Sequence, residues 1–264
     1  MRIIGRISVA VDLHCHILPG LDDGARDLDD AVAMARQAQE DGIAAVCATP
    51  HIRHDHEVRI AQLPERRAAL AAAIAAAGIA TRILPGGEVA ATALDGLDDD
   101  ELAAVSLGGG GRWILLEPAP GPLGDRLDEA VRVLGERGYR ALIAHPERHF
   151  AADLVPRLAA LTARGALVQA TADYLVRGPT QAGMLTLAAA GVIHVLASDA
   201  HSSRGGRPVA ITPALAALAG AEPVAAHLRW IARTAPAAIA AGEEVSPPYA
   251  PAPAPATSPP PAGR

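Results

Sequence analysis

The sequence predicts one α/β domain over residues 1–245, folded as a TIM-like barrel, a distorted seven-stranded β/α barrel. Short runs rich in Val, Ile and Leu alternate with longer stretches rich in Ala, Leu, Arg and Glu, which is typical of β/α units around a parallel sheet. Seven such units in about 240 residues match a TIM barrel in number and spacing and are too many for a small open sheet.

The expected strands, in chain order, are 9–14, 43–49, 80–84, 112–117, 139–144, 166–170 and 192–197. The expected helices are 28–41, 61–77, 97–105, 125–137, 153–164, 179–190, 213–219 and 223–240. A doubly wound sheet is the alternative fold, but it predicts a GxGxxG loop where the sequence has ILPGLDDG. The segment 246–264 is rich in Pro and Ala without periodicity, so we expect a disordered tail with no catalytic role.

Composition excludes several classes of function. All 23 basic residues are Arg, so chemistry that needs a Schiff-base or P-loop lysine is impossible. A net charge of −6 argues against nucleic acid as a partner, although a small phosphorylated substrate remains compatible with it. The two cysteines cannot form a disulfide framework, and we find neither a run of 18 apolar residues nor an export signal. We therefore expect a cytoplasmic protein without membrane insertion.

Metal-ligand residue types recur at the predicted strand ends. Asp12, His14 and His16 alternate along the first strand, which predicts one shared face, although two hydrogen-bonded core histidines are the alternative for an isolated H-x-H pair. Further candidates follow the second, third, fourth, fifth and seventh strands, namely His51, Glu88, Glu117, His145, Asp199 and His201. In a barrel these ends gather on one face, and mixed imidazole and carboxylate donors suit two or three Mn, Fe or Zn ions. Closely spaced metals fit hydrolysis of a phosphate ester.

The ordered motifs HCH, TPH, a Glu after the third strand, another after the fourth, HPER and SDAH resemble the PHP (polymerase and histidinol phosphatase) superfamily. Within it, DLHCHILPGLDDGARD, ATPHIRHD, LLEPAPGP, LIAHPERH and VLASDAHSS resemble the bacterial capsule and exopolysaccharide tyrosine-protein phosphatases, over residues 10–240. The resemblance implies the PHP fold and hydrolysis of phosphotyrosine in a protein. An autophosphorylated bacterial tyrosine kinase of polysaccharide export would then be the partner.

The resemblance also implies a role for each matching residue. Three metal groups are expected, formed by His14, His16, Glu88 and Asp199, by Glu88, Glu117 and His145, and by Asp23, His51 and His201. Asp22 is the alternative to Asp23, which the family pattern favours because it directly precedes Gly24. Arg148 and Arg207 would bind phosphoryl oxygens, since a planar guanidinium does so well. Family members often have a second His after TPH, whereas this chain has Ile52, and we expect His54 and His56 to be solvated loop residues.

The expected mechanism is in-line attack of a metal-bridging hydroxide on phosphorus, with Arg148 countering the developing charge. One rival is a cysteine nucleophile at Cys47, which begins a C-x5-R segment ending at Arg53 but lacks the glycines of a phosphate-cradling loop. Histidinol-phosphate hydrolysis and a non-catalytic, metal-stabilised phosphoprotein scaffold are further alternatives. The alternative to a phosphoryl-binding role for Arg148 is that it is a surface arginine paired with Glu147. The sequence leaves the oligomeric state open.

Overall fold

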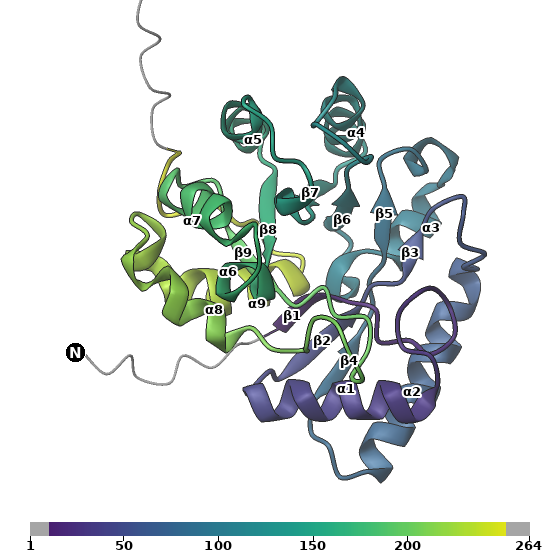
Figure 1. The fold of residues 1–264 in the computed structure, drawn as a ribbon. Coiled ribbons are helices and arrows are strands. Elements are labelled where there is room, and N and C mark those ends of the chain that lie inside the picture. The colour runs from purple at the N-terminus through teal and green to yellow at the C-terminus, as the bar shows by residue number, and fades with distance from the viewer. Residues whose placement is uncertain (1–10, 252–264) are drawn as a thin grey trace, which may run out of the picture.

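The computed structural model describes residues 11–251, which form parallel strands surrounded by helices (Figure 1). The strands are β1 (Val11–Cys15), β2 (Ala45–Ala48), β3 (His51–Ile52), β4 (Arg82–Leu84), β5 (Glu88–Ala90), β6 (Trp113–Glu117), β7 (Arg140–Ile143), β8 (Leu167–Thr171) and β9 (Val195–Ala197). The α-helices are α1 (Leu28–Asp41), α2 (Leu63–Ala76), α3 (Asp99–Ala104), α4 (Asp125–Glu136), α5 (Leu154–Ala163), α6 (Ala172–Val176), α7 (Gln181–Ala189), α8 (Thr212–Ala217) and α9 (Ala235–Ala240).

The strands form two sheets, and every neighbouring pair is parallel. One sheet has the order β1-β2-β4 and the other the order β3-β5-β6-β7-β8-β9. Between residues 11 and 251 no continuous ladder closes them into a barrel, although a single parallel bridge joins Cys15 to Ala200 beyond β9. The α/β architecture is therefore confirmed, whereas the closed seven-stranded barrel is not.

The expected and observed elements differ at three places. β3 and β5 are two short extra strands, and Pro50, which has no backbone N–H to donate to a ladder, separates β2 from β3. The short helix α6 follows β8 directly and was not expected. The single helix expected at 223–240 is instead a 3₁₀ turn, the π-helical turn Trp230–Thr234 and α9.

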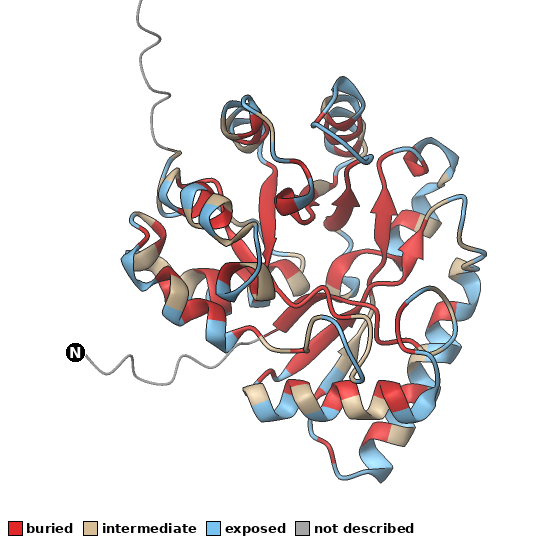
Figure 2. Cartoon of the chain, in the orientation of Figure 1, coloured by how far each residue is buried: buried red, intermediate tan, exposed pale blue. Residues whose placement is uncertain are grey.

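An outer core lies between the sheets and the helices, and Figure 2 shows buried residues on the strands and on the inward faces of the helices. Helix α1 illustrates it, because Ala31, Met34, Ala35 and Ala38 recur at helical spacing and are all buried. The Asp27 side chain begins this helix by accepting a hydrogen bond from Asp30 N at 2.8 Å. The abundant alanines allow close approach of helix and sheet.

An inner core joins residues from both sheets. Val11 and Leu13 of β1 pack in it with Trp113 and Leu115 of β6, and Ile239 of α9 is also part of it. Side chains alternate along a strand, so Glu117 at the end of β6 continues the face of Trp113 and Leu115. The strand ends therefore place a polar layer directly against this apolar one.

A register shift in β1 explains how its histidines reach this polar layer. Strict alternation after Val11 and Leu13 would turn His14 away from the inner core. Between Asp12 and Cys15, however, β1 has one residue more than β2, and such a bulge reverses the alternation. Asp12 therefore does not share the face of His14, contrary to expectation. Its carboxylate accepts hydrogen bonds from Ser198 N and Oγ and fastens β1 to the end of β9.

The beginning of the expected tail packs against the body of the protein. The Tyr249 hydroxyl donates a hydrogen bond to Ile193 O, and its ring lies 5.9 Å from that of His194. Residues 252–264 lie outside the described residues, as do residues 9–10 of the first expected strand, so a disordered tail stays a prediction. No helix within 11–251 is both long enough and apolar enough to cross a membrane.

Candidate metal centre

The strand ends of both sheets bring all nine predicted ligand residues together. His14 is the last but one residue of β1 and His16 lies just beyond this strand. His51 begins β3, Glu88 begins β5 and Glu117 ends β6, while the others follow β7 and β9 or lie in the turn after β1. Seven of the nine are buried, His201 is half-buried, and Asp23 is exposed. Within this set, compact groups of donor atoms overlap: two of them share Glu88, and the third joins them through His16 and His51.

The first group consists of four atoms. His14 Nε2 lies 3.2 Å from His16 Nε2, and Glu88 Oε2 lies 3.4 and 3.3 Å from these two nitrogens. Asp199 Oδ1 lies 3.4 Å from His14 Nε2 and 3.8 Å from His16 Nε2. Donor atoms about 2.1 Å from one ion lie roughly 3.0 to 3.4 Å apart at octahedral or tetrahedral angles. The spacing of the His14, His16 and Glu88 atoms is therefore that of ligands directed at one point, whereas Asp199 Oδ1 lies within this range of His14 only.

The second group shares Glu88 with the first. Glu88 Oε1 lies 2.8 Å from His145 Nε2, and Glu88 Oε2 lies 2.9 Å from His51 Nδ1. Glu117 completes the group, with Oε1 4.0 Å from His145 Nε2 and Oε2 3.7 Å from His51 Nδ1. The two oxygens of Glu88 thus face two different sets of partners, as a bridging carboxylate requires.

The third group distinguishes the adjacent carboxylates of Asp22 and Asp23. Asp23 Oδ1 lies 3.4 Å from His51 Nε2 and 3.5 Å from His201 Nε2. Asp22 instead accepts hydrogen bonds from His16 Nδ1 at 2.8 Å and from His51 N at 3.0 Å. Asp23 therefore belongs to a group of candidate donor atoms, whereas Asp22 hydrogen-bonds to the other ring nitrogen of His16.

Gly24 allows the turn that carries Asp22 and Asp23 to approach β1 closely. A Cβ atom at this position would lie 2.2 Å from His16 O. Gly24 N also donates to Asp22 Oδ1 at 3.0 Å. Glycine is therefore required here for the backbone to pass over His16.

Unsatisfied buried atoms indicate that the cluster fits cations. Glu88 Oε2, Asp199 Oδ1 and His51 Nδ1 are buried without a hydrogen-bond partner, although each lies close to other donor atoms of the cluster. Buried polar atoms without partners are costly, and coordination of a divalent ion would satisfy all three. The donor set of imidazoles and carboxylates suits Mn, Fe or Zn.

Backbone conformation also singles out this cluster. Among non-glycine residues 11–251, only His145 and Asp199 have positive φ angles, 35° and 49°. Such conformations cost of order 1–3 kcal/mol and persist where the surroundings enforce them, often at functional sites. Both residues belong to the predicted ligand set.

The buried carboxylates and imidazoles of the cluster shift one another's pKa values. Burial opposes ionisation of Glu88, but the imidazoles of His14, His145 and His16 outweigh it and hold the Glu88 pKa well below its usual range. Burial likewise opposes protonation of His16, but Asp22 and Glu88 raise its pKa to about 10. The site therefore attracts positive charge strongly, and a metal would take the place of the protons on the imidazoles.

Two orienting residues escaped the sequence analysis. Gln169 Oε1 lies 3.0 Å from His14 Nδ1 and also accepts a hydrogen bond from His145 N at 3.3 Å. Ser198 holds Asp12 and donates from Oγ to His14 O at 3.2 Å. A fully buried Gln in a mainly apolar strand, as in β8, is the signal that marks such a residue.

Arg148 and Arg207 both reach the cluster, but in different ways. Arg148 Nη2 donates to Asp199 Oδ2 at 3.0 Å, and the side chain stays 40% exposed. Arg207 is more enclosed, since Nε donates to Asp199 O at 2.7 Å and Nη2 lies 3.1 Å from His201 Nδ1. Arg148 therefore keeps more donors free for a ligand. No ion pair joins it to the buried Glu147, which disfavours that alternative.

The remaining candidates are placed as follows. His56 stacks on His51 with ring centroids 4.9 Å apart, whereas His54 is exposed. Cys47 is fully buried in β2, where burial raises its pKa to about 12. A thiol with that pKa is protonated at neutral pH, so it is no nucleophile.

The fold and site define a class of protein, an α/β protein whose strand ends carry His, Asp and Glu groups that could hold metal ions. The family model "Capsular polysaccharide synthesis, CpsB/CapC" matches residues 10–222, and the chain belongs to this family. It is 34% identical over 202 residues to the tyrosine-protein phosphatase YwqE of Bacillus subtilis, covering 73% of this chain and 77% of the relative. It is 27% identical over 201 residues to the putative tyrosine-protein phosphatase CapC of Staphylococcus aureus, with the same shares of 73% and 77%.

A solved structure extends the likeness to three dimensions. It comes from work on YwqE of Bacillus subtilis and CpsB of Streptococcus pneumoniae, described as unique metal-dependent tyrosine phosphatases. The TM-score is 0.77 at 29% identity, and the match covers 92% of this chain and 99% of that one. The resemblance to capsule-type phosphatases inferred from the motifs is confirmed.

Proposed function

We propose that this chain is a metal-dependent protein-tyrosine phosphatase, a phosphoric monoester hydrolase that releases phosphate from tyrosine side chains. The observation that carries the proposal is the set of overlapping ligand groups around Glu88, with Arg148 beside them. Membership of the capsular polysaccharide family and the printed names of two relatives support it. The substrate would be a bacterial tyrosine kinase of capsule or exopolysaccharide synthesis.

Nine residues would hold two or three divalent ions, in the first place Mn. His14, His16, Glu88 and Asp199 would hold one ion, Glu88, Glu117 and His145 a second, and Asp23, His51 and His201 a third. When bound, such ions lower the pKa of water and withdraw charge from phosphoryl oxygens. Gln169 and Asp22 fix the orientation of the ligand imidazoles through their other ring nitrogens.

The residues of the chain itself supply binding and charge stabilisation. Arg148 would hold the phosphoryl oxygens with the guanidinium donors that Asp199 does not use, and Arg207 would assist while it braces Asp199. Little acid catalysis is needed, because a tyrosine phenolate has a pKa of about 10 and leaves far more readily than an alkoxide. This leaving group distinguishes phosphotyrosine from phosphoserine as a substrate.

We also infer that the two sheets are arcs of one distorted barrel with the PHP fold. The shared inner core and the bridge from Cys15 to Ala200 support this geometry. Two reduced cysteines, both buried and free, are compatible with action in the cytoplasm.

A direct comparison of substrates tests the proposed function. The full chain, loaded with Mn, is offered a phosphotyrosine peptide and histidinol phosphate side by side, and phosphate release is measured. We expect kcat/KM for the peptide to exceed that for histidinol phosphate by about two orders of magnitude. Preference for histidinol phosphate would favour the small-molecule alternative. Binding of the peptide without turnover would favour the scaffold.

A further inference from the structure

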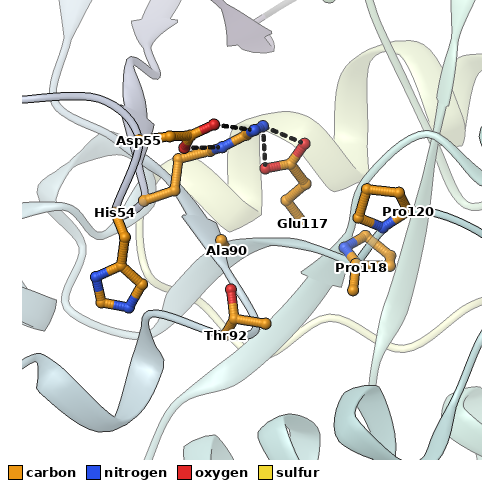
Figure 3. A pocket seen from close by; sticks show the side chains of 9 residues that line it. His54, Asp55, Ala90, Thr92, Glu117, Pro118 and Pro120 are labelled. Atoms are coloured by element: carbon orange, nitrogen blue, oxygen red, sulfur yellow. Dashed lines mark hydrogen bonds and ion pairs between the residues drawn. The ribbon is translucent and has the colours of Figure 1, made fainter.

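A pocket of about 190 Å³ (Figure 3) has one of the nine ligand candidates, Glu117, in its wall. Most of its wall is apolar or small, and consists of Ala90, Thr92, Pro118, Ala119 and Pro120. The remaining wall is polar and comes from Arg53, His54, Asp55 and Glu117. The pocket thus combines a mainly apolar interior with a charged edge.

Glu117 joins this pocket to the cluster. Its carboxylate lines the pocket and also lies 3.7 Å from His51 Nδ1 and 3.9 Å from Arg148 Nη1. Other pockets of the described chain, one beside Ile60 and two near Arg233, are lined by none of the nine ligand candidates. A group attached to a phosphoryl centre bound by Arg148 would therefore find this pocket next to it.

The size of the pocket and its apolar wall indicate which group it can hold. An apolar cavity of roughly 150 Å³ is large enough to hold benzene, so a pocket of about 190 Å³ is sufficient for a phenyl ring. Proline and alanine offer rigid apolar surfaces that lose little side-chain entropy on binding. A serine or threonine side chain is too small to fill the same space.

Arg53 forms a fixed wall of the pocket. Its Nε and Nη2 each donate to Asp55 at 2.6 Å, and Nη1 donates to Glu117 at 3.3 Å (Figure 3). All three nitrogens are therefore engaged, in contrast to those of Arg148. Arg53 acts as a positioning residue that holds Glu117 at the border between the pocket and the cluster.

We propose that this pocket receives the aromatic ring of the phosphotyrosyl side chain and so selects aryl over alkyl phosphates. The proposal rests on the proposed phosphatase function and adds to it the place where the leaving group binds. The phosphoryl group then lies at the cluster and Arg148, and the ring lies between Thr92 and the proline-rich segment 118–120.

Two phosphonates of different size test the pocket without turnover. We measure the dissociation constants of phenylphosphonate and methylphosphonate for the Mn-loaded full chain by calorimetry. Burial of the ring predicts that phenylphosphonate binds about tenfold or more tightly. Thr92→Trp and Ala119→Trp fill the pocket from two exposed positions and should reduce this ratio to about twofold or less. The KM for a phosphotyrosine peptide should rise about tenfold in both variants, with kcat changing less.

Thr186→Trp is the matched control, because Thr186 is exposed on α7 and lines no part of this pocket. It should keep the wild-type ratio and KM. The ratio is internal to each variant, so a general loss of folded protein leaves it unchanged. An unchanged ratio in both pocket variants would overturn the proposal, as would wild-type protein that binds both phosphonates equally.

The outcomes also separate this proposal from the function on which it rests. Wild-type protein that releases no phosphate from the peptide contradicts the phosphatase function itself, whatever the ratio. Normal turnover with an unchanged phosphonate ratio contradicts only the ring pocket. A variant with an altered peptide KM but an unchanged phosphonate ratio would assign the pocket to a neighbouring peptide side chain, which also overturns the proposal.

Discussion

Two fully buried histidines of this protein, His16 and His194, behave in opposite ways. At the strand ends, Asp22 and Glu88 surround His16 and, against the effect of burial, raise its pKa to about 10. His194, in the turn before β9, is equally buried, but burial alone acts on it and lowers its pKa to about 3. Its Nδ1 accepts a hydrogen bond from Val168 N at 3.1 Å.

The difference teaches that burial of a histidine does not by itself mark a metal site. His194 is a neutral structural group whose acceptor nitrogen completes the hydrogen bonding of β8, and its ring stacks on Tyr249. His16 has buried carboxylates as neighbours, which favour cations. Carboxylate neighbours at strand ends, rather than histidines alone, therefore define the candidate site.

The largest effect is expected when the central carboxylate is neutralised. Glu88→Gln keeps the shape of the side chain but removes the charge that all three ligand groups use directly or through their histidines. We expect kcat/KM for a phosphotyrosine peptide to fall by at least about 10³-fold and bound metal, measured by elemental analysis, to fall with it. Glu136→Gln on the exposed side of α4 is the control. A Glu88→Gln protein that retains its metals and its turnover would show that the cluster is structural.

Arg148→Ala should have the next largest effect. The side chain contacts Asp199 but is not a metal donor, so metal content and melting temperature should be retained. Transition-state stabilisation should fall by about 3 kcal/mol, the scale seen when one preorganised donor is removed. Arg148→Lys should recover part of the loss. The control is Arg177→Ala, at an exposed arginine paired with Asp173, and this variant should keep wild-type kinetics. Rates within about twofold of wild type for Arg148→Ala would shift attention to Arg207.

The neutral state of His194 is tested by the pH dependence of protein stability. Its pKa is lower in the folded than in the unfolded chain, so the unfolded state binds the proton and stability is lost as pH falls below about 6.5. Lowering the pH from 7 to 5 should cost about 2 kcal/mol through this residue. His194→Gln removes that contribution, so urea unfolding of the variant should depend less on pH. Parallel pH dependence of wild type and variant would mean that His194 is not held neutral.

Cys47→Ser should have the smallest effect on activity. The thiol is buried and protonated, so turnover should stay within about twofold of wild type. Placing a hydroxyl in this apolar environment should cost stability on the order of 1 kcal/mol, measured by thermal unfolding. A loss of turnover of several orders of magnitude with intact fold and metals would revive the cysteine mechanism.

The sequence predicted the main elements and the convergence of the ligand residues, because strand ends follow directly from hydrophobic runs and parallel connectivity. It could not predict the bulge in β1, since the extra residue relative to β2 depends on pairing with residues about 34 positions further along the chain. Asp12 was misplaced for that reason. The roles of Gln169 and Asp22 also depend on tertiary contacts that no local pattern records. The ligand roles of the nine residues stay predictions until a metal is measured.

The most direct test of the account is a titration of activity against bound metal. The full chain is stripped by exhaustive chelation, its metal content is verified, and hydrolysis of a phosphotyrosine peptide is followed as Mn is added back. We predict no turnover in the metal-free protein and recovery of activity as two or three ions bind per chain. Full activity in a verified metal-free preparation would contradict the central claim that the cluster around Glu88 is the catalytic centre.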